Sequence, residues 1–160
     1  MSTVSDGKSY YFDTNALLKY YRQERGSLEI QKLVLAAHLI LVSPLTLLEC
    51  YSVLLRYVRK KQLPLAEARL IIKRLHKDSG LLDSISGLFQ VVPLPTGSFS
   101  KAESILLEQA GQFSFGANDA LHVAIAHLLP DKPIFVTSDK SLKNVCNNIN
   151  LPCYDPELEQ

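Results

Sequence analysis

Short apolar runs alternate with helical patterns along nearly the whole chain, and this alternation restricts the possible folds more than any other feature. The run Leu39–Val42 contains no polar residue, as expected for a strand that is buried on both faces. In the helical pattern that follows, Leu47, Tyr51 and Leu54 recur at i, i+4 and i+7 and so form one apolar face. Strands that alternate with helices predict a mostly parallel sheet with helices on both faces.

Caps and helix breakers set the expected boundaries of these elements. Ser43 and Pro44 are typical of the first residues of a helix, and Pro130 ends another helix. Strands are expected at Ser9–Phe12, Leu39–Val42, Leu88–Val92 and Ile134–Thr137, with an edge strand at Leu151–Tyr154. Helices are expected at Thr14–Tyr21, Ser27–Ala37, Pro44–Lys60, Pro64–Lys77, Phe99–Ala110, Asn118–Leu129 and Lys140–Asn147. The predicted fold class is α/β, a three-layer α/β/α sandwich whose mostly parallel central sheet has four to five strands.

Size and composition predict one globular domain over residues 1–160. Of the 160 residues, 47% are hydrophobic and 21% are charged, which excludes a disordered chain. Residues 1–8 lack the apolar core of a signal peptide, and no run approaches the ~20 apolar residues of a membrane helix. The three cysteines have no C-x-x-C spacing, which argues against a zinc knuckle and a disulfide framework. We therefore expect a cytoplasmic protein that is not bound to a membrane.

Four acidic residues stand at junctions between predicted elements. Asp13 and Asp139 each follow a strand, Asp119 lies in the first turn of a helix, and Glu49 lies about two turns into another helix. Each alone has an ordinary explanation, because three are plausible helix caps and a helical Glu is usually solvated. Together they indicate a shared site, since right-handed crossovers bring all strand ends to one edge of the sheet.

Carboxylates gathered at that edge would repel one another. At about 5 Å and an effective dielectric constant near 20, each pair costs roughly 3 kcal/mol. A hard divalent cation removes this cost, and carboxylate oxygens are the ligands that Mg²⁺ and Mn²⁺ prefer. Such an ion can activate a water and neutralise a phosphoryl oxygen, so phosphodiester hydrolysis is the expected chemistry.

Four motifs containing these acids resemble those of PIN-domain proteins, above all the VapC-type toxin ribonucleases of type II toxin–antitoxin systems. The motifs are Tyr11–Leu17, Ser43–Glu49, Asn118–Ala126 and Phe135–Asp139. The resemblance spans about residues 9–155. It implies a metal-dependent endoribonuclease with Mg²⁺ or Mn²⁺ at a site formed by Asp13, Glu49, Asp119 and Asp139. It further implies supporting roles for Asn15 and Thr137, a homodimer, an RNA substrate and a cognate antitoxin protein.

Two alternatives stay open within the same fold. The chain can be a catalytically silent PIN-fold module that binds RNA or protein, or a PIN nuclease that processes RNA and is not a toxin. A haloacid-dehalogenase-type phosphoryl transferase is disfavoured, because Asp13-Thr14-Asn15 lacks the second acid of its Asp-x-Asp motif. Silent members are expected to lose one or more acids, whereas all four are present here.

The formal net charge is only +1, but it is strongly segregated. Residues 56–77 contain eight basic residues and one acid, a net charge of +7, which leaves −6 for the remainder. This stretch is either an RNA-binding surface or a solvated helical hairpin. The RNA-binding hypothesis names Arg56, Arg59, Lys60, Lys61, Lys73 and Arg74.

Two further groups of side chains are expected to have no part in a functional site. The basic cluster after the first helix, Lys19, Arg22 and Arg25, is expected to be solvated rather than to flank a substrate groove. The four histidines are expected to be structural, since His122 and His127 lie five residues apart and make a poor metal pair on a helix.

Overall fold

The computed structural model describes residues 7–81 and 87–158 of the chain. The expectation that residues 1–8 contain no signal peptide therefore concerns a segment that lies largely outside the described residues. Among the described helices, none combines the length and apolar character needed to cross a membrane.

The core of the protein is a five-stranded parallel sheet. Its strands are β1 (Ser9–Phe12), β2 (Leu39–Val42), β3 (Gln90–Val91), β4 (Ile134–Val136) and β5 (Cys153–Tyr154). Their spatial order is β3-β2-β1-β4-β5, and all four strand pairings are parallel. At the centre, Tyr11 of β1 is in register with Leu41 on one side and Phe135 on the other.

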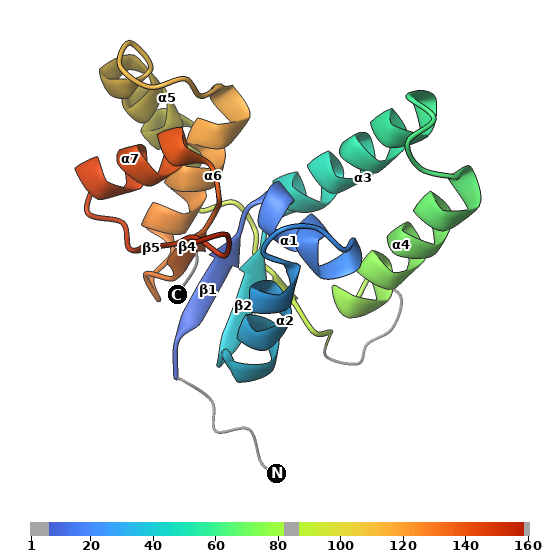
Figure 1. The fold of residues 1–160 in the computed structure, drawn as a ribbon. Coiled ribbons are helices and arrows are strands. Elements are labelled where there is room, and N and C mark those ends of the chain that lie inside the picture. The colour runs from blue at the N-terminus through green and yellow to red at the C-terminus, as the bar shows by residue number, and fades with distance from the viewer. Residues whose placement is uncertain (1–6, 82–86, 159–160) are drawn as a thin grey trace.

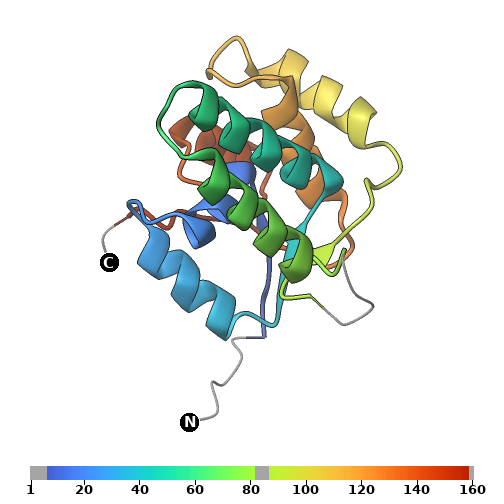
Figure 2. The same ribbon diagram turned by 90° about the vertical axis from the view of Figure 1, so that its right-hand side faces the viewer.

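Among the described residues, seven helices cover this sheet in two layers (Figure 1). Their bounds are α1 Thr14–Tyr21, α2 Ser27–Ala36, α3 Pro44–Arg59, α4 Leu65–Asp78, α5 Ser98–Gln109, α6 Ala117–Leu128 and α7 Lys140–Asn148. Helices α1 to α4 lie on one side of the sheet and α5 to α7 on the other, as the two views show (Figures 1 and 2). The architecture is the predicted α/β/α sandwich with a parallel sheet.

The alternation of side chains along β1 divides the core between the two layers. Tyr10 and Phe12 pack with α1 to α4, whereas Tyr11 packs with α5 to α7. Neighbouring side chains of a strand point to opposite faces, so one aromatic strand supplies both halves of the core. Tyr11 and Phe12 are both fully buried, and β1 is therefore the rigid centre from which the site is built.

The strand order creates a crevice beside β1. The chain runs outward from β1 through β2 to β3, and then crosses back to β4 on the other side of β1. Connections leave β1 and β4 on opposite faces of the sheet, so the space beyond their carboxyl ends is open. Asp13 follows β1 directly, and Asp139 follows β4 after two residues.

Helix starts agree with the cap residues in the sequence. Ser43 and Thr46 form a capping box at the start of α3, with Pro44 as the first helical residue. The side chains of Asp13 and Asp139 cap α1 and α7. Predicted boundaries hold to within two residues throughout. The largest differences are at the two edge strands, since β3 and β5 each begin two residues later than predicted.

Candidate active site

Asp13 is a buried carboxylate at the end of the central strand. Its side chain is 5% exposed, and its Oδ1 accepts a hydrogen bond of 2.7 Å from the Ala16 amide. Burial raises the pKa of Asp13 above its ordinary value, and the nearby charge of Asp119 adds to this effect. A hydrogen bond with Thr137 and the neighbouring His122 act in the opposite direction. The protein thus holds a carboxylate where its ionised form is poorly solvated.

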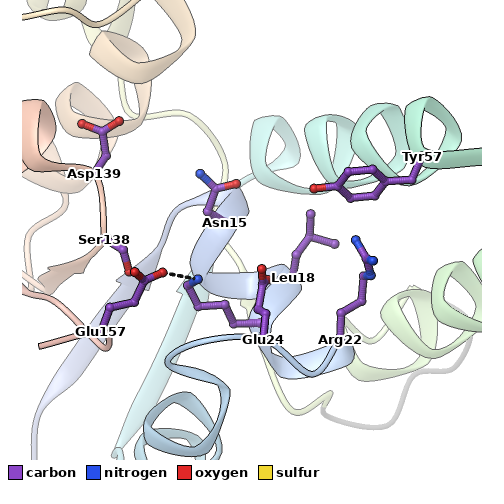
Figure 3. A pocket seen from close by; sticks show the side chains of 9 residues that line it. Asn15, Leu18, Arg22, Glu24, Tyr57, Ser138, Asp139 and Glu157 are labelled. Carbon is purple, nitrogen blue, oxygen red and sulfur yellow. Dashed lines mark hydrogen bonds and ion pairs between the residues drawn. The ribbon is translucent and has the colours of Figure 1, made fainter. Parts of the chain in front are cut away.

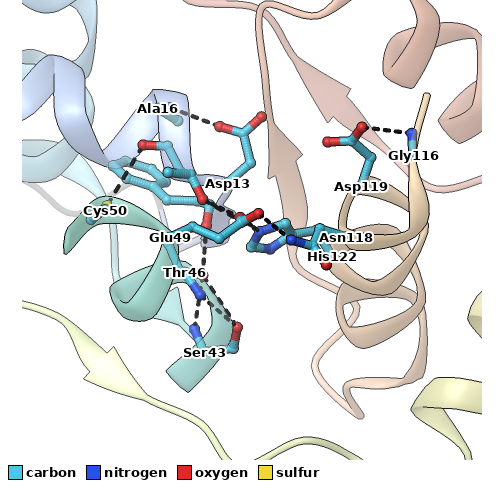
Figure 4. Close-up of polar contacts among 12 residues, drawn as sticks. Asp13, Ala16, Ser43, Thr46, Glu49, Cys50, Gly116, Asn118, Asp119 and His122 are labelled. Atoms are coloured by element: carbon cyan, nitrogen blue, oxygen red, sulfur yellow. Dashed lines mark hydrogen bonds and ion pairs between the residues drawn. The ribbon is translucent and has the colours of Figure 1, made fainter. Parts of the chain in front are cut away.

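Glu49 is held by three side chains from two other helices. Its Oε2 accepts hydrogen bonds of 2.6 Å from Thr14 Oγ1 and 2.6 Å from His122 Nε2, and its Oε1 accepts one of 2.8 Å from Asn118 Nδ2 (Figure 4). Although partial burial alone would raise the pKa of Glu49, the bonds from His122 and Thr14 outweigh it and lower the pKa to about 2. Glu49 is therefore a fixed carboxylate, and the alternative of a solvated helical Glu is wrong.

Asp119 and Asp139 approach the same space from the other side of the crevice. Asp119 Oδ2 accepts a bond of 2.9 Å from the Gly116 amide, and Asp139 Oδ1 accepts one of 2.9 Å from the Leu142 amide. Both carboxylates therefore serve as caps, as their ordinary explanation predicts. Each uses one oxygen in this way, so the cap role leaves the second oxygen for a ligand.

The four acids line one small cavity of about 40 Å³ at the carboxyl edge of the sheet. The lining residues are Asp13, Thr14, Asn15, Glu49, Asp119, His122, Asp139 and Leu142. Asn15 lies on this wall, as expected of a supporting residue. Thr137 is fully buried behind it, and its Oγ1 accepts a bond of 3.1 Å from the Asp139 amide. Thr137 therefore joins Asp13 to Asp139.

His122 is a site residue that the sequence analysis missed. It is 2% exposed. Its Nε2 contacts Glu49, and its Nδ1 lies 3.0 Å from the hydroxyl of Tyr11. That hydroxyl in turn donates to Ser43 Oγ at 2.9 Å. The available signal was the i, i+3 spacing from Asp119, which puts both side chains on one face of α6.

The basic stretch lies apart from the acidic cavity. All eight of its basic side chains are exposed, on the last turns of α3, in the turn after it, and on α4. None of them lines the cavity. Arg74 is stacked on Tyr21, 5.2 Å from the ring centroid, and so has a packing role as well. The six residues named for RNA binding are accessible, and that function stays a prediction.

The expectation for the first basic cluster is wrong for Lys19. Its side chain is only 6% exposed, and its Nζ lies 2.6 Å from Glu157 Oε1 in an ion pair. Arg22 is partly buried over the ring of Tyr57, at 4.4 Å from the centroid. Arg25 is exposed as expected, and it donates to the Glu157 carbonyl at 3.1 Å. A segment near the end of the chain thus covers this cluster.

The chemistry of the cavity suits a hard divalent cation. Its acids offer carboxylate oxygens, which Mg²⁺ and Mn²⁺ prefer, and burial leaves the charge of Asp13 poorly compensated. In the described residues, no three His, Cys, Asp or Glu side chains stand close enough together to hold an ion as they are. Metal binding by the four acids therefore stays a prediction that rests on their shared cavity and on the donor type.

Together, the fold and the site define a three-layer parallel α/β protein with an acidic crevice at the switch point of its sheet. The family model of the PIN domain matches residues 10–148. The chain belongs to the PIN-domain family, as its four motifs predicted. Comparison with curated proteins gives no match.

Solved structures similar to this chain have the same fold at low sequence identity. VapBC2 from Rickettsia felis, bound to a DNA fragment from its promoter, has a TM-score of 0.64 at 13% identity and covers 92% of this chain and 98% of that one. FitAcB from Neisseria gonorrhoeae has a TM-score of 0.64 at 14% identity and covers 92% and 97%. PAE2754 from Pyrobaculum aerophilum has a TM-score of 0.65 at 17% identity and covers 96% and 87%.

Proposed function

We propose that this protein is a metal-dependent endoribonuclease that hydrolyses RNA phosphodiester bonds, with Mg²⁺ or Mn²⁺ as its cofactor. The observation that carries the proposal is the shared cavity of Asp13, Glu49, Asp119 and Asp139 at the open edge of the sheet. Membership of the PIN-domain family supports nuclease activity.

In this proposal the four acids would hold the cation. A bound Mg²⁺ or Mn²⁺ would lower the pKa of a water and neutralise charge on the phosphoryl oxygens. The chain's own contribution is preorganisation. Thr14, Asn118 and His122 keep Glu49 ionised and fixed, so this carboxylate need not reorient when substrate arrives.

Two supporting residues complete the site. Thr137 links Asp13 to Asp139, which fixes the spacing between the carboxylates that follow β1 and β4. Asn15 stands exposed on the cavity wall, where its amide is available to a substrate phosphate. The exposed basic residues of α3 and α4 would attract the RNA backbone from the side.

We further propose that the protein is the toxin of a toxin–antitoxin pair, acts in the cytoplasm as a homodimer and is restrained by a cognate antitoxin. Support comes from its structural neighbours, among them VapBC2, FitAcB and a toxin–antitoxin complex from Klebsiella pneumoniae. A PIN nuclease for RNA processing and a catalytically silent binding module are the alternatives.

Cleavage of cellular RNA by the purified protein tests the proposal. Cleavage should require Mg²⁺ or Mn²⁺, stop with a chelator and resume when the metal is restored. The toxin role predicts in addition that expression arrests growth and that co-expression of a neighbouring small gene relieves the arrest. Cleavage without growth arrest would favour the processing enzyme, whereas RNA binding without cleavage would favour the silent module.

A further inference from the structure

A second cavity of about 330 Å³ adjoins the acidic one (Figure 3). Its lining residues are Asn15, Leu18, Lys19, Arg22, Glu24, Tyr57, Ser138, Asp139 and Glu157. Asn15 and Asp139 belong to the walls of both cavities, so the two are continuous. The volume lies at the lower end of the ~300–1,000 Å³ of small-ligand sites. A substrate held at the four acids would extend into this space.

Lys19 is the unusual residue of this second cavity. A lysine side chain is rarely as deeply buried as the 6% exposure observed here. Its ammonium group has three donors, and among the described residues Glu157 is its only partner. Lys19 lines a cavity next to the acidic site. Burying a cation at this point carries a desolvation cost, which an anionic ligand would offset.

The side chain of Glu157 can rotate away from Lys19 while its backbone is held in place by hydrogen bonds. Its amide donates to Asp155 Oδ1 at 2.9 Å, and its carbonyl accepts from Arg25. Asp155 is itself paired with Lys143. The carboxylate, in contrast, is 29% exposed and contacts Lys19 alone among the described residues. A rotation of this one side chain would expose the ammonium group without moving the segment.

On the basis of the proposed function, we propose that this cavity binds the RNA nucleotide next to the scissile phosphate. Lys19 would bind the backbone phosphate of that nucleotide, and the Glu157 carboxylate would occupy the place of the phosphate until RNA displaces it. Carboxylate and phosphate oxygens are both acceptors for an ammonium group, so one can replace the other. The Arg22 guanidinium, stacked on Tyr57, supplies a second positive charge on the wall of the same cavity.

Binding of single-stranded RNA without cleavage tests this inference. The probe is a fluorescein-labelled oligouridine of about 12 nucleotides, and its anisotropy is measured with the full chain in a chelator. Glu157→Gln keeps the shape of the side chain and the backbone contacts but removes the competing charge. We expect it to tighten Kd by about 3–10-fold. Lys19→Met should weaken Kd by a similar factor and lower the salt slope of log K by about 0.7.

The double variant separates a phosphate site from a general charge effect. In the Lys19→Met background, Glu157→Gln should not tighten Kd. The Glu157 carboxylate weakens RNA binding only by occupying the Lys19 ammonium group, so its effect depends on Lys19. The pair Lys32–Glu29, with a separation of 2.7 Å, provides matched controls, because neither side chain lines the cavity that contains Lys19. Lys32→Met and Glu29→Gln should each change Kd by less than about 2-fold, since Lys32 is well exposed to solvent.

Several outcomes would overturn the inference. They are no RNA binding by the wild type, unchanged or weaker binding by Glu157→Gln, and a gain from Glu157→Gln that persists without Lys19. Thermal unfolding of each variant identifies a loss of fold, and Glu157→Ala then serves as the second variant. The binding assay contains no divalent cation, so it is independent of catalysis. If the variants show the predicted binding pattern but the wild type does not cleave RNA in Mg²⁺ or Mn²⁺, the nuclease proposal is refuted and the binding site is retained. If the protein cleaves RNA in Mg²⁺ or Mn²⁺ but the variants do not show the predicted binding pattern, the binding site is refuted and the nuclease proposal is retained.

Discussion

His122 Nε2 donates to Glu49 Oε2 across 2.6 Å, and this bond joins α6 to α3 at the centre of the acidic cavity. The ionised carboxylate of Glu49 can only accept hydrogen bonds, so Nε2 must carry the proton. The other ring nitrogen faces the Tyr11 hydroxyl at 3.0 Å. His122 therefore positions one of the four acids and is itself fixed by the central strand.

Removal of the His122 side chain should weaken catalysis. We expect His122→Ala to lower the rate of RNA cleavage by about 10–100-fold, as is usual when a residue that orients a ligand is lost. His122→Gln, which can still donate to Glu49, should recover part of the rate. The rates are measured with saturating Mn²⁺ on a labelled RNA. His127→Ala, on the same helix but outside the cavity, is the control, and an equal loss there would refute a specific role.

Asp13→Asn should raise thermal stability in the absence of metal. The buried carboxylate has a raised pKa, so its ionised form destabilises the folded state at neutral pH, and Asn removes that charge but still caps α1. A gain on the order of 1 kcal/mol corresponds to about 2–4 °C in Tm. The gain should fade as pH falls toward about 4, where Asp13 becomes protonated in both states.

Calorimetry in a chelator checks the stability of this variant. Asp131→Asn changes an exposed acid at the opposite edge of the sheet and should leave Tm unchanged. A lower Tm for Asp13→Asn at neutral pH would mean that Asp13 is present for stability, and the case for a functional carboxylate would be lost.

Ionisation of Glu49 should affect stability in the opposite direction to ionisation of Asp13. Its pKa in the folded protein is about 2, below the ordinary value of 4.5, so its contribution to stability is complete above about pH 4.5 and is lost as the pH falls toward 2. Urea unfolding of wild type and Glu49→Gln across this range should show a difference that narrows on acidification. Glu103→Gln, an exposed acid on α5, should show no such change. A difference that is constant with pH would argue against the bonds from His122 and Thr14.

The basic residues of α3, of α4 and of the turn between them should contribute to RNA affinity through their charge. The double variant Lys60→Ala/Lys61→Ala removes two exposed charges, and we expect the salt slope of log K to fall by about 1.4 for a single strand. Anisotropy between about 50 and 200 mM salt gives this slope. An unchanged slope would assign these residues to a solvated surface or to a protein partner.

The sequence predicted the elements of this fold because each boundary has a local cause. Ser43 and Pro44 begin α3, Asp13 caps α1, and the apolar run Leu39–Val42 is typical of a strand that is buried on both faces. Parallel connections of one hand then place the carboxyl ends of all strands at the same edge of the sheet. These rules also brought the four acids to one edge, where the structure places them around one cavity.

What the sequence could not predict depends on contacts between distant residues. The Lys19–Glu157 pair spans 138 positions, and no local pattern places a segment near the end of the chain over α1. The bond of His122 to Glu49 spans 73 positions and needs the packing of α6 against α3. Burial of Lys19 and the role of His122 therefore emerge only from tertiary structure.

The most direct test of the central claim is the initial rate of RNA cleavage in Mn²⁺ by four single variants: Asp13→Asn, Glu49→Gln, Asp119→Asn and Asp139→Asn. One site formed by all four carboxylates predicts that each variant is folded and loses at least about 100-fold in rate, while the control Asp131→Asn retains wild-type activity. Wild-type rates in any two of the four would contradict a shared catalytic site.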